Sequence, residues 1–169
     1  ILAWLGFAAV QISSAAQSAR NGLDTMESLR GVATGDVFEL SDTVGDEEVA
    51  TRQLSLAAED FSNAQEQLTS IAVRPLWFIP VIGRQLRSAA ALSGAAEQTT
   101  SRAAEATNEL VDVLNSTTTT GETRLKAVQR TEEVLTEFRD GIAELDLGPE
   151  VGLLPQLADA RNRFASEYR

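Results

Sequence analysis

Apolar side chains along this 169-residue chain recur in steps of three and four residues. Steps of this size bring side chains onto one side of an α-helix, whereas a half-buried β-strand would alternate apolar and polar residues. No alternating stretch of useful length occurs in the sequence. The pattern therefore predicts an all-α protein.

Four long helices and a shorter one account for the pattern. The first begins at the N-terminus and ends near Gly31 to Gly35, the second covers about residues 46–72, and the third starts at or near Pro80. The fourth covers about residues 122–145, and a short amphipathic segment with Leu157 and Phe164 follows. Short turns imply antiparallel neighbours, so we expect an elongated antiparallel helical bundle of four long helices plus a short C-terminal helix.

Each long helix has a seam, by which we mean the line of apolar residues expected to face its neighbours. The expected seams are, helix by helix, Leu2, Leu5, Ala9, Ile12, Ala16, Ala19, Leu23 and Met26; Ala50, Leu54, Ala57, Phe61, Ala64, Leu68 and Ile71; Ile82, Leu86, Ala89, Ala96, Ala103, Leu110 and Leu114; and Leu125, Val128, Leu135, Phe138, Ile142 and Leu145. In the third helix Ser93, Thr100 and Thr107 take intervening positions. These small polar residues predict either close helix contacts or the lining of a ligand cavity.

A corner with two prolines separates the second helix from the third, in the segment from Arg74 to Leu86. Proline lacks an N–H and fixes φ, so it suits the first turn of a helix and breaks its interior. One interpretation is that the corner's apolar residues close one end of the bundle core. The other is a docking surface for a partner or for lipid headgroups. The candidate interaction residues are Trp77, Phe78, Ile79 and Pro80.

The N-terminal run, residues 1–12, is apolar, and no charge occurs before Arg20. It is too short to span a bilayer, which takes about 20 residues. We interpret it as the end of a membrane-anchor helix, continuous with the first helix of a bundle domain over residues 13–169; a core helix and a signal-sequence remnant are the alternatives. Its large side chains spread around the helix, so we expect the run to lie outside this chain's own core. The candidate membrane-embedded residues are Ile1, Leu2, Trp4, Leu5, Phe7 and Val10.

Composition removes several classes of function. Twenty-five acidic residues against 14 basic ones give a net charge of −11, which disfavours nucleic acid as a partner. The chain has no Cys and no His, so thiol nucleophiles, Ser-His triads and imidazole or thiolate metal ligands are excluded. The acidic segment from Asp36 to Glu48 does not have the spacing of an EF-hand loop. We expect no enzyme activity, no cofactor and no metal.

The corner residues also carry a resemblance. Pro75-Leu76-Trp77, followed by Ile79-Pro80-Val81-Ile82-Gly83, resembles a recurring passage of an uncharacterised bacterial family known as domain of unknown function 4012. The alanine-rich flanks and the later Gly121 to Leu125 start are similar as well. The resemblance implies a membrane-anchored envelope protein, mostly of actinobacteria, in settings of surface polysaccharide assembly. It implies no catalytic residues.

Two function classes fit these observations. The first is a non-enzymatic helical stalk or interaction module on the extracytoplasmic side of the cell membrane, with a protein partner or a second copy and possible contact with envelope polysaccharide. The second is an extracytoplasmic four-helix sensor domain that binds a small ligand. A sensor should have a pocket between helices, lined by residues such as Arg or Thr.

Overall fold

The computed structural model describes residues 2–34, 46–116 and 121–168, and these residues contain helices and turns but no strand. The α-helices are α1 (Leu2–Thr34), α2 (Asp46–Thr69), α3 (Pro80–Ser116), α4 (Gly121–Ala143) and α5 (Pro155–Tyr168). A short 3-10 helix, η2 (Arg74–Phe78), precedes α3. The expectation of an all-α fold is therefore confirmed.

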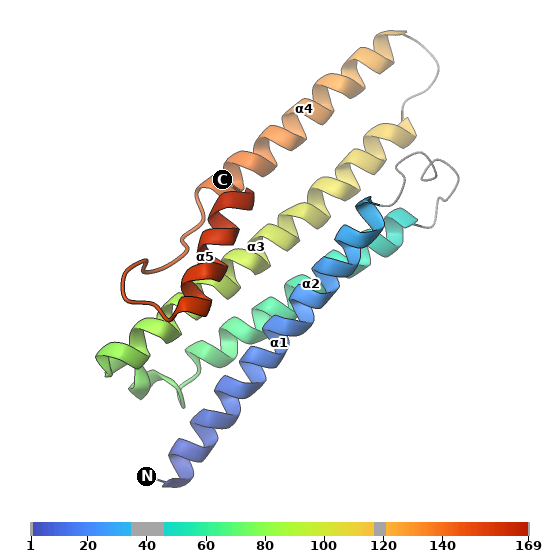
Figure 1. The fold of residues 1–169 in the computed structure, drawn as a ribbon. Coiled ribbons are helices and arrows are strands. Elements are labelled where there is room, and N and C mark those ends of the chain that lie inside the picture. Colours follow the sequence, from blue (N-terminus) through green and yellow to red (C-terminus); the bar gives the residue numbers. More distant parts are fainter. Residues whose placement is uncertain (1, 35–45, 117–120, 169) are drawn as a thin grey trace.

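The four long helices lie side by side and successive helices run in opposite directions (Figure 1). Helix α1 packs on α2, α2 on α3, and α3 on α4, while the shorter α5 contacts α3 and α4. Helix α3 has 37 residues, which at the α-helical rise corresponds to a length of about 55 Å. The start of α1, the η2 turn and the start of α3 lie at one end of this elongated molecule (Figure 1).

Small residues allow α1 to approach α2 closely. Ala8, Ala15 and Gly22 are spaced seven residues apart on α1, and all three are buried. A Cβ atom added at Gly22 would lie 2.9 Å from Cζ of Phe61, so this ring of α2 rests directly on the glycine. The contact is therefore made by the smallest side chains of α1.

The predicted seam of α1 is consequently wrong by one position at three of its residues, whereas Ile12 packs on the core as predicted. Ala9 and Ala16 are exposed, and Leu23 is 60% exposed, whereas the residue before each of them is buried. Hydropathy favours leucine for a buried position, but two helices that pack closely need small side chains where they touch. Leu23 is left outside for that reason.

The seam of α2 is confirmed at its centre. Ala57, Phe61, Ala64 and Leu68 are all buried. The helix ends at Thr69, three residues before the predicted end, because the chain turns there with the N–H groups of Val73 and Arg74 donating to the carbonyl of Ser70. Ile71, expected in the seam, lies beyond that end and is 83% exposed.

Helix α3 is buried on more than one side because it contacts α2, α4 and α5. Two of its buried hydroxyl groups are satisfied within the helix: Thr99 Oγ1 donates to the carbonyl of Ala95 at 2.8 Å and Thr100 Oγ1 to that of Ala96 at 2.9 Å. The buried hydroxyl of Ser88 has no hydrogen-bond partner among the described residues. Ser93 is buried as well. Of the two interpretations of the small polar residues, close helix contact therefore describes Ser93 and Thr100.

Helix α4 is packed well only near its C-terminal end. Ile142, Leu145 and Leu147 form a core cluster with Ala95 of α3, and half-buried Phe138 and Phe164 pack against it. Three residues of its predicted seam are exposed instead, namely Leu125 (60%), Val128 (64%) and Leu135 (51%). The side of α4 that meets α3 is the one with buried Val134, so the apolar stripe beside it has no covering helix among the described residues.

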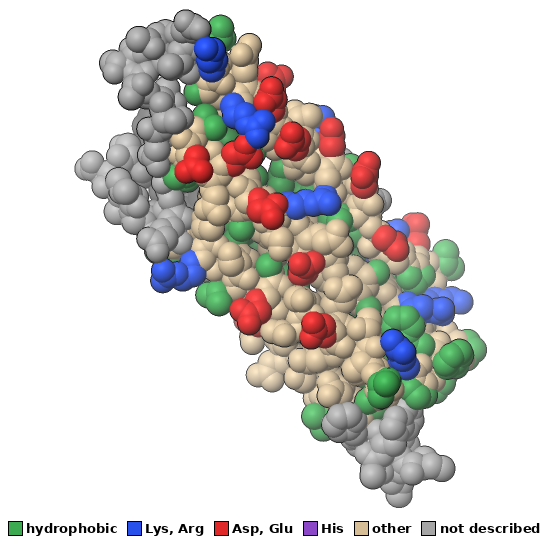
Figure 2. Space-filling model, turned by 180° about the vertical axis from the view of Figure 1, so that it is seen from behind, with side chains coloured by type: hydrophobic (Ala, Val, Ile, Leu, Met, Phe, Trp, Pro, Cys, Tyr) green, Lys and Arg blue, Asp and Glu red, His purple; other side chains and the backbone are tan. Residues whose placement is uncertain are grey.

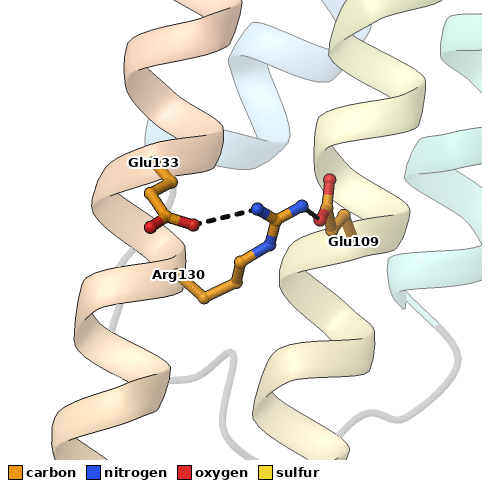
Figure 3. A network of polar contacts seen from close by, with 3 residues as sticks. All are labelled: Glu109, Arg130 and Glu133. Carbon is orange, nitrogen blue, oxygen red and sulfur yellow. Dashed lines mark hydrogen bonds and ion pairs between the residues drawn. The ribbon is translucent and has the colours of Figure 1, made fainter.

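A polar contact links α4 to α3 in its less packed half. The guanidinium of Arg130 donates to Glu109 of α3 and, at 2.9 Å, to Glu133 on its own helix (Figure 3). The hydrogen bond to Glu133, followed by that to Glu109, raises the pKa of Arg130 above its ordinary value. Because all three side chains are solvent-exposed, water and salt screen the ion pairs and they contribute little to stability.

Candidate functional site

The corner between α2 and α3 divides into an inward and an outward half. In the inward half Leu76 is buried, and Trp77 packs on a core cluster formed by α1, α2 and α3. The indole Nε1 of Trp77 donates to the carbonyl of Leu68 at 3.3 Å, which covers a backbone acceptor at the end of α2. For Leu76 and Trp77 the interpretation as the end of the core is the one that matches the structure.

The outward half presents apolar side chains to solvent. Phe78 is 87% exposed, and Ile79 and Pro80 are exposed as well, so the interpretation as the end of the core does not describe these three residues. Val81 and Ile82, in the first turn of α3, are 70% and 43% exposed; Ile82 had been expected in the seam. We name this surface the corner patch: it consists of Ile71, Phe78, Ile79, Val81 and Ile82.

Backbone contacts fix the shape of the corner. The N–H of Gly83 donates to the carbonyl of Ile79 at 2.7 Å. A Cβ atom at Gly83 would overlap the carbonyl oxygen of Trp77, so only glycine lets η2 fold back this tightly on α3. The aromatic pair is thus held with Trp77 turned inward and Phe78 turned outward.

The loop between α4 and α5 is fastened to the same place. The side-chain amide of Gln85 donates to the carbonyl of Gly152 at 2.9 Å and accepts from the N–H of Leu154 at 2.9 Å. Arg84 Nη1 donates to the carbonyl of Val151 at 3.2 Å. Exposed Val151 and Leu154 are therefore brought next to the start of α3, which sequence reasoning missed because these partners are 67 to 69 residues apart.

Charge is distributed unevenly along the molecule. Residues 67–96 contain three arginines, Arg74, Arg84 and Arg87, and no acidic residue, although the chain as a whole carries −11. All three arginines are exposed. In Figure 2 hydrophobic side chains gather at one end of this face together with some basic ones, while acidic side chains and further basic ones lie along the rest of its length. The sequence contained this signal, since the acid-free interval can be read directly from it.

The N-terminal run continues into α1 without a break. Val10 is 62% exposed, whereas Ala8 is buried in the core cluster and Ile12 packs against it. The expectation that residues 1–12 lie outside this chain's core is therefore wrong for Ala8 and Ile12, because α1 already packs on its neighbours there. Of the other candidate membrane-embedded residues, Ile1 lies outside the described part, as do the side chains of Leu2, Trp4, Leu5 and Phe7. Within the described residues, no helix combines the length and hydropathy that crossing a membrane requires.

An open recess of about 340 Å³ lies between α2, α3 and the C-terminal end of α4. Gln65, Gln98 and Arg102 line it, together with Glu144 and Asp146 on the opposite side. The side chain of Arg102 lies against Gly141, where a Cβ atom would collide with Nη1. This Nη1 is buried and has no hydrogen-bond acceptor among the described residues, which is uncommon for a guanidinium N–H.

The expected small polar residues do not form this recess. Ser93, Thr100 and Thr107 are absent from its lining, which is supplied instead by glycines, glutamines and charged residues. No group of three or more His, Cys, Asp or Glu able to hold a metal ion occurs in the described part of the chain. Most of the acidic segment from Asp36 to Glu48 falls outside that part.

Comparisons with protein-family models, with curated proteins and with solved structures found no match for this chain. The resemblance of the corner to domain of unknown function 4012 stays a prediction.

Proposed function

We propose that this protein is a non-enzymatic, membrane-anchored helical stalk or interaction module on the extracytoplasmic side of the cell envelope. The observation that carries the proposal is the sorting of side chains along the rod. Exposed apolar residues and three arginines occur at the end where α1 begins, within an interval that has no acidic residue, whereas the remaining length contains all the acidic residues together with the other basic ones. A rod with that arrangement is suited to stand with one end at a membrane. The link to surface polysaccharide assembly depends on the resemblance alone.

The helices are suited to act as a spacer. Helix α1 contacts α2 and α2 contacts α3 along most of their lengths through small buried residues, so bending the rod would require close-packed backbones to separate. The end far from the corner would then stand about 50 Å from the membrane. A protein partner or a second copy could be held at that distance.

The proposal can be tested by vesicle flotation of the 169-residue chain beside a variant without residues 1–7. This deletion stops before buried Ala8, so the core cluster keeps all its described members. We expect flotation to fall at least fivefold while the thermal melt stays nearly unchanged. Removal of residues 167–169 at the other terminus is the control and should leave flotation intact. Equal flotation of all three proteins would contradict an N-terminal anchor.

A ligand-binding sensor is the second candidate, and the recess is the observation that favours it. Arg102 offers a buried, unsatisfied N–H there, and Gln65 and Gln98 add amide groups, which suits an anionic group of a small molecule. Because Glu144 and Asp146 line the opposite side, that group would have to lie at Arg102. Calorimetric titration with acetate, succinate and inorganic phosphate would test this function. Saturable binding that Arg102→Gln abolishes and Arg139→Gln preserves would support the sensor. No heat with any of the three anions would count against it.

A further inference from the structure

We propose that the corner patch and its arginines form a membrane-interfacial surface that binds anionic phospholipid. Phe78 and Val81 would enter the boundary between headgroups and acyl chains, and Arg74, Arg84 and Arg87 would contact lipid phosphates. The inference rests on the proposed function in one respect, namely that a membrane lies at this end of the rod. It adds a second contact with the bilayer, independent of the N-terminal run, and it names the lipid class.

The corner segment exposes several apolar side chains, whereas ordinary protein surfaces expose such residues singly. Ile71, Phe78 and Val81 are 83%, 87% and 70% exposed, and they lie in the turn after α2, at the end of η2 and in the first turn of α3. The core beneath them is complete without them, since Leu76 and Trp77 already close it. Contiguous exposed apolar residues on a fixed backbone are typical of interaction sites.

The arginines determine which kind of surface the patch can meet. A guanidinium binds phosphate in bidentate fashion and is more weakly hydrated than the lysine ammonium, so it suits the headgroup layer. Arg87 Nε donates to the carbonyl of Gly83, and Arg84 Nη1 donates to the carbonyl of Val151. The other N–H groups of both guanidiniums remain available as donors. Arg74 is exposed at the first residue of η2, the short helix that leads into α3.

Two acidic residues of the loop after α4 have contacts of their own. Asp146 accepts the N–H of Gly148 at 2.8 Å, and Glu150 forms an ion pair with Arg161 at 3.7 Å. Residues 67–96 themselves contain no acidic residue, and Arg74, Arg84 and Arg87 are all exposed.

An anionic bilayer fits this end better than a second copy of the chain does. Two corner patches facing each other would bring arginines against arginines. An anionic bilayer attracts the basic end and repels the acidic remainder of the chain, which carries a net charge of −14 because residues 67–96 contribute +3 to the total of −11. The charge distribution would thus also orient the rod, with the corner against the headgroups.

Insertion can be measured directly because the chain contains no cysteine. Val81→Cys and Val128→Cys form a matched pair: both are helical valines, 70% and 64% exposed, one in the corner patch and one on α4. Each variant of the full chain is labelled with a polarity-sensitive fluorophore and mixed with phosphatidylcholine vesicles, with or without phosphatidylglycerol. We expect a blue shift, and quenching by lipids brominated on the acyl chain, at position 81 with phosphatidylglycerol and neither effect at position 128.

The charge contribution needs a second pair of variants. Arg74→Gln with Arg87→Gln removes two corner charges, and Arg139→Gln with Arg163→Gln removes two exposed arginines elsewhere. Each basic residue near an anionic membrane surface adds to the attraction, so the two corner substitutions together should weaken vesicle binding about tenfold or more. The control pair should leave binding unchanged. Raised salt should reduce the difference between the pairs.

Each result decides the question. If the chain floats with vesicles but the label at position 81 stays unquenched, the corner surface is overturned and the proposed anchor stands. If the chain does not associate with phosphatidylglycerol vesicles at all, both proposals fail. A shift at position 81 that follows protein concentration in the absence of lipid would identify a second copy as the occupant and would also overturn the lipid assignment.

Discussion

Two regions of the molecule are packed differently: the layer formed by α1, α2 and α3, and the N-terminal half of α4. The hydropathy of their residues does not indicate this difference. The layer packs through alanine, glycine and serine, and its contact positions include fully buried Ala57, Ala64 and Ser88. The N-terminal half of α4 has larger apolar residues, yet Leu125 and Val128 are more than half exposed. Close approach of backbones, rather than the size of the apolar side chains, distinguishes the tightly packed region. The predictions below test this difference, beginning with the largest expected effect.

Phe61→Ala should cost about 3–5 kcal/mol in the free energy of unfolding, because it removes the ring that fills the space above Gly22 and leaves a cavity. Urea denaturation followed by circular dichroism measures this change. A loss below about 1 kcal/mol would mean that α1 closes onto α2 without the ring and that the tight contact is not what stabilises the layer.

Ile142→Ala should cost about 2–4 kcal/mol, because Ile142 belongs to the core cluster that holds the C-terminal end of α4. Hydrogen exchange should show a regional effect, with amides of α4 and α5 losing protection before those of α2. Uniform loss of protection across the chain would show that α4 unfolds together with the layer and would remove the contrast drawn here.

Trp77→Ala should cost about 2 kcal/mol, less than a fully buried tryptophan, since Trp77 is half-buried but both packs on the core cluster and donates to Leu68. The matched control is Phe78→Ala, which should leave the urea midpoint nearly unchanged because its ring is 87% exposed. Equal effects of the two substitutions would contradict the division of the corner into inward and outward halves.

Val128→Ser combined with Leu135→Ser should change the free energy of unfolding by no more than about 0.5 kcal/mol, as expected of surface positions. The urea melt is the measurement. A loss of several kcal/mol would show that another chain or a second copy covers this stripe of α4, and size-exclusion chromatography of both proteins would then reveal a change in assembly.

Helical content, helix order and the corner followed from local rules. Periodicity predicted the helices, and the second proline of the corner predicted the start of α3 at Pro80. The centre of the α2 seam, from Ala57 to Leu68, was correct because large and small apolar residues there lie on one narrow stripe. For the helices, the start of α3 and the centre of the α2 seam, the residues close together in sequence were sufficient for a correct prediction.

Other features depend on which helix meets which. Alanines at adjacent positions of α1 have equal hydropathy, so the sequence could not distinguish Ala8 from Ala9 or Ala15 from Ala16. The exposure of Leu125 follows from which side of α4 meets α3, namely the side with buried Val134. The attachment of the α4–α5 loop through Gln85 joins residues 67 and 69 positions apart, and no local pattern indicates it.

Three glycines of this fold define a signature by which distant relatives could be recognised. Gly83 faces the Trp77 carbonyl, and Gly148 and Gly152 have φ angles of +70° and +77°, so any other residue at these positions would be strained. Alanine-rich helices diverge easily and align ambiguously, but these positions cannot drift without altering the corner or its attached loop. A search that requires Trp-x5-Gly, and later Gly-x3-Gly, would therefore select for this architecture where overall sequence identity no longer can.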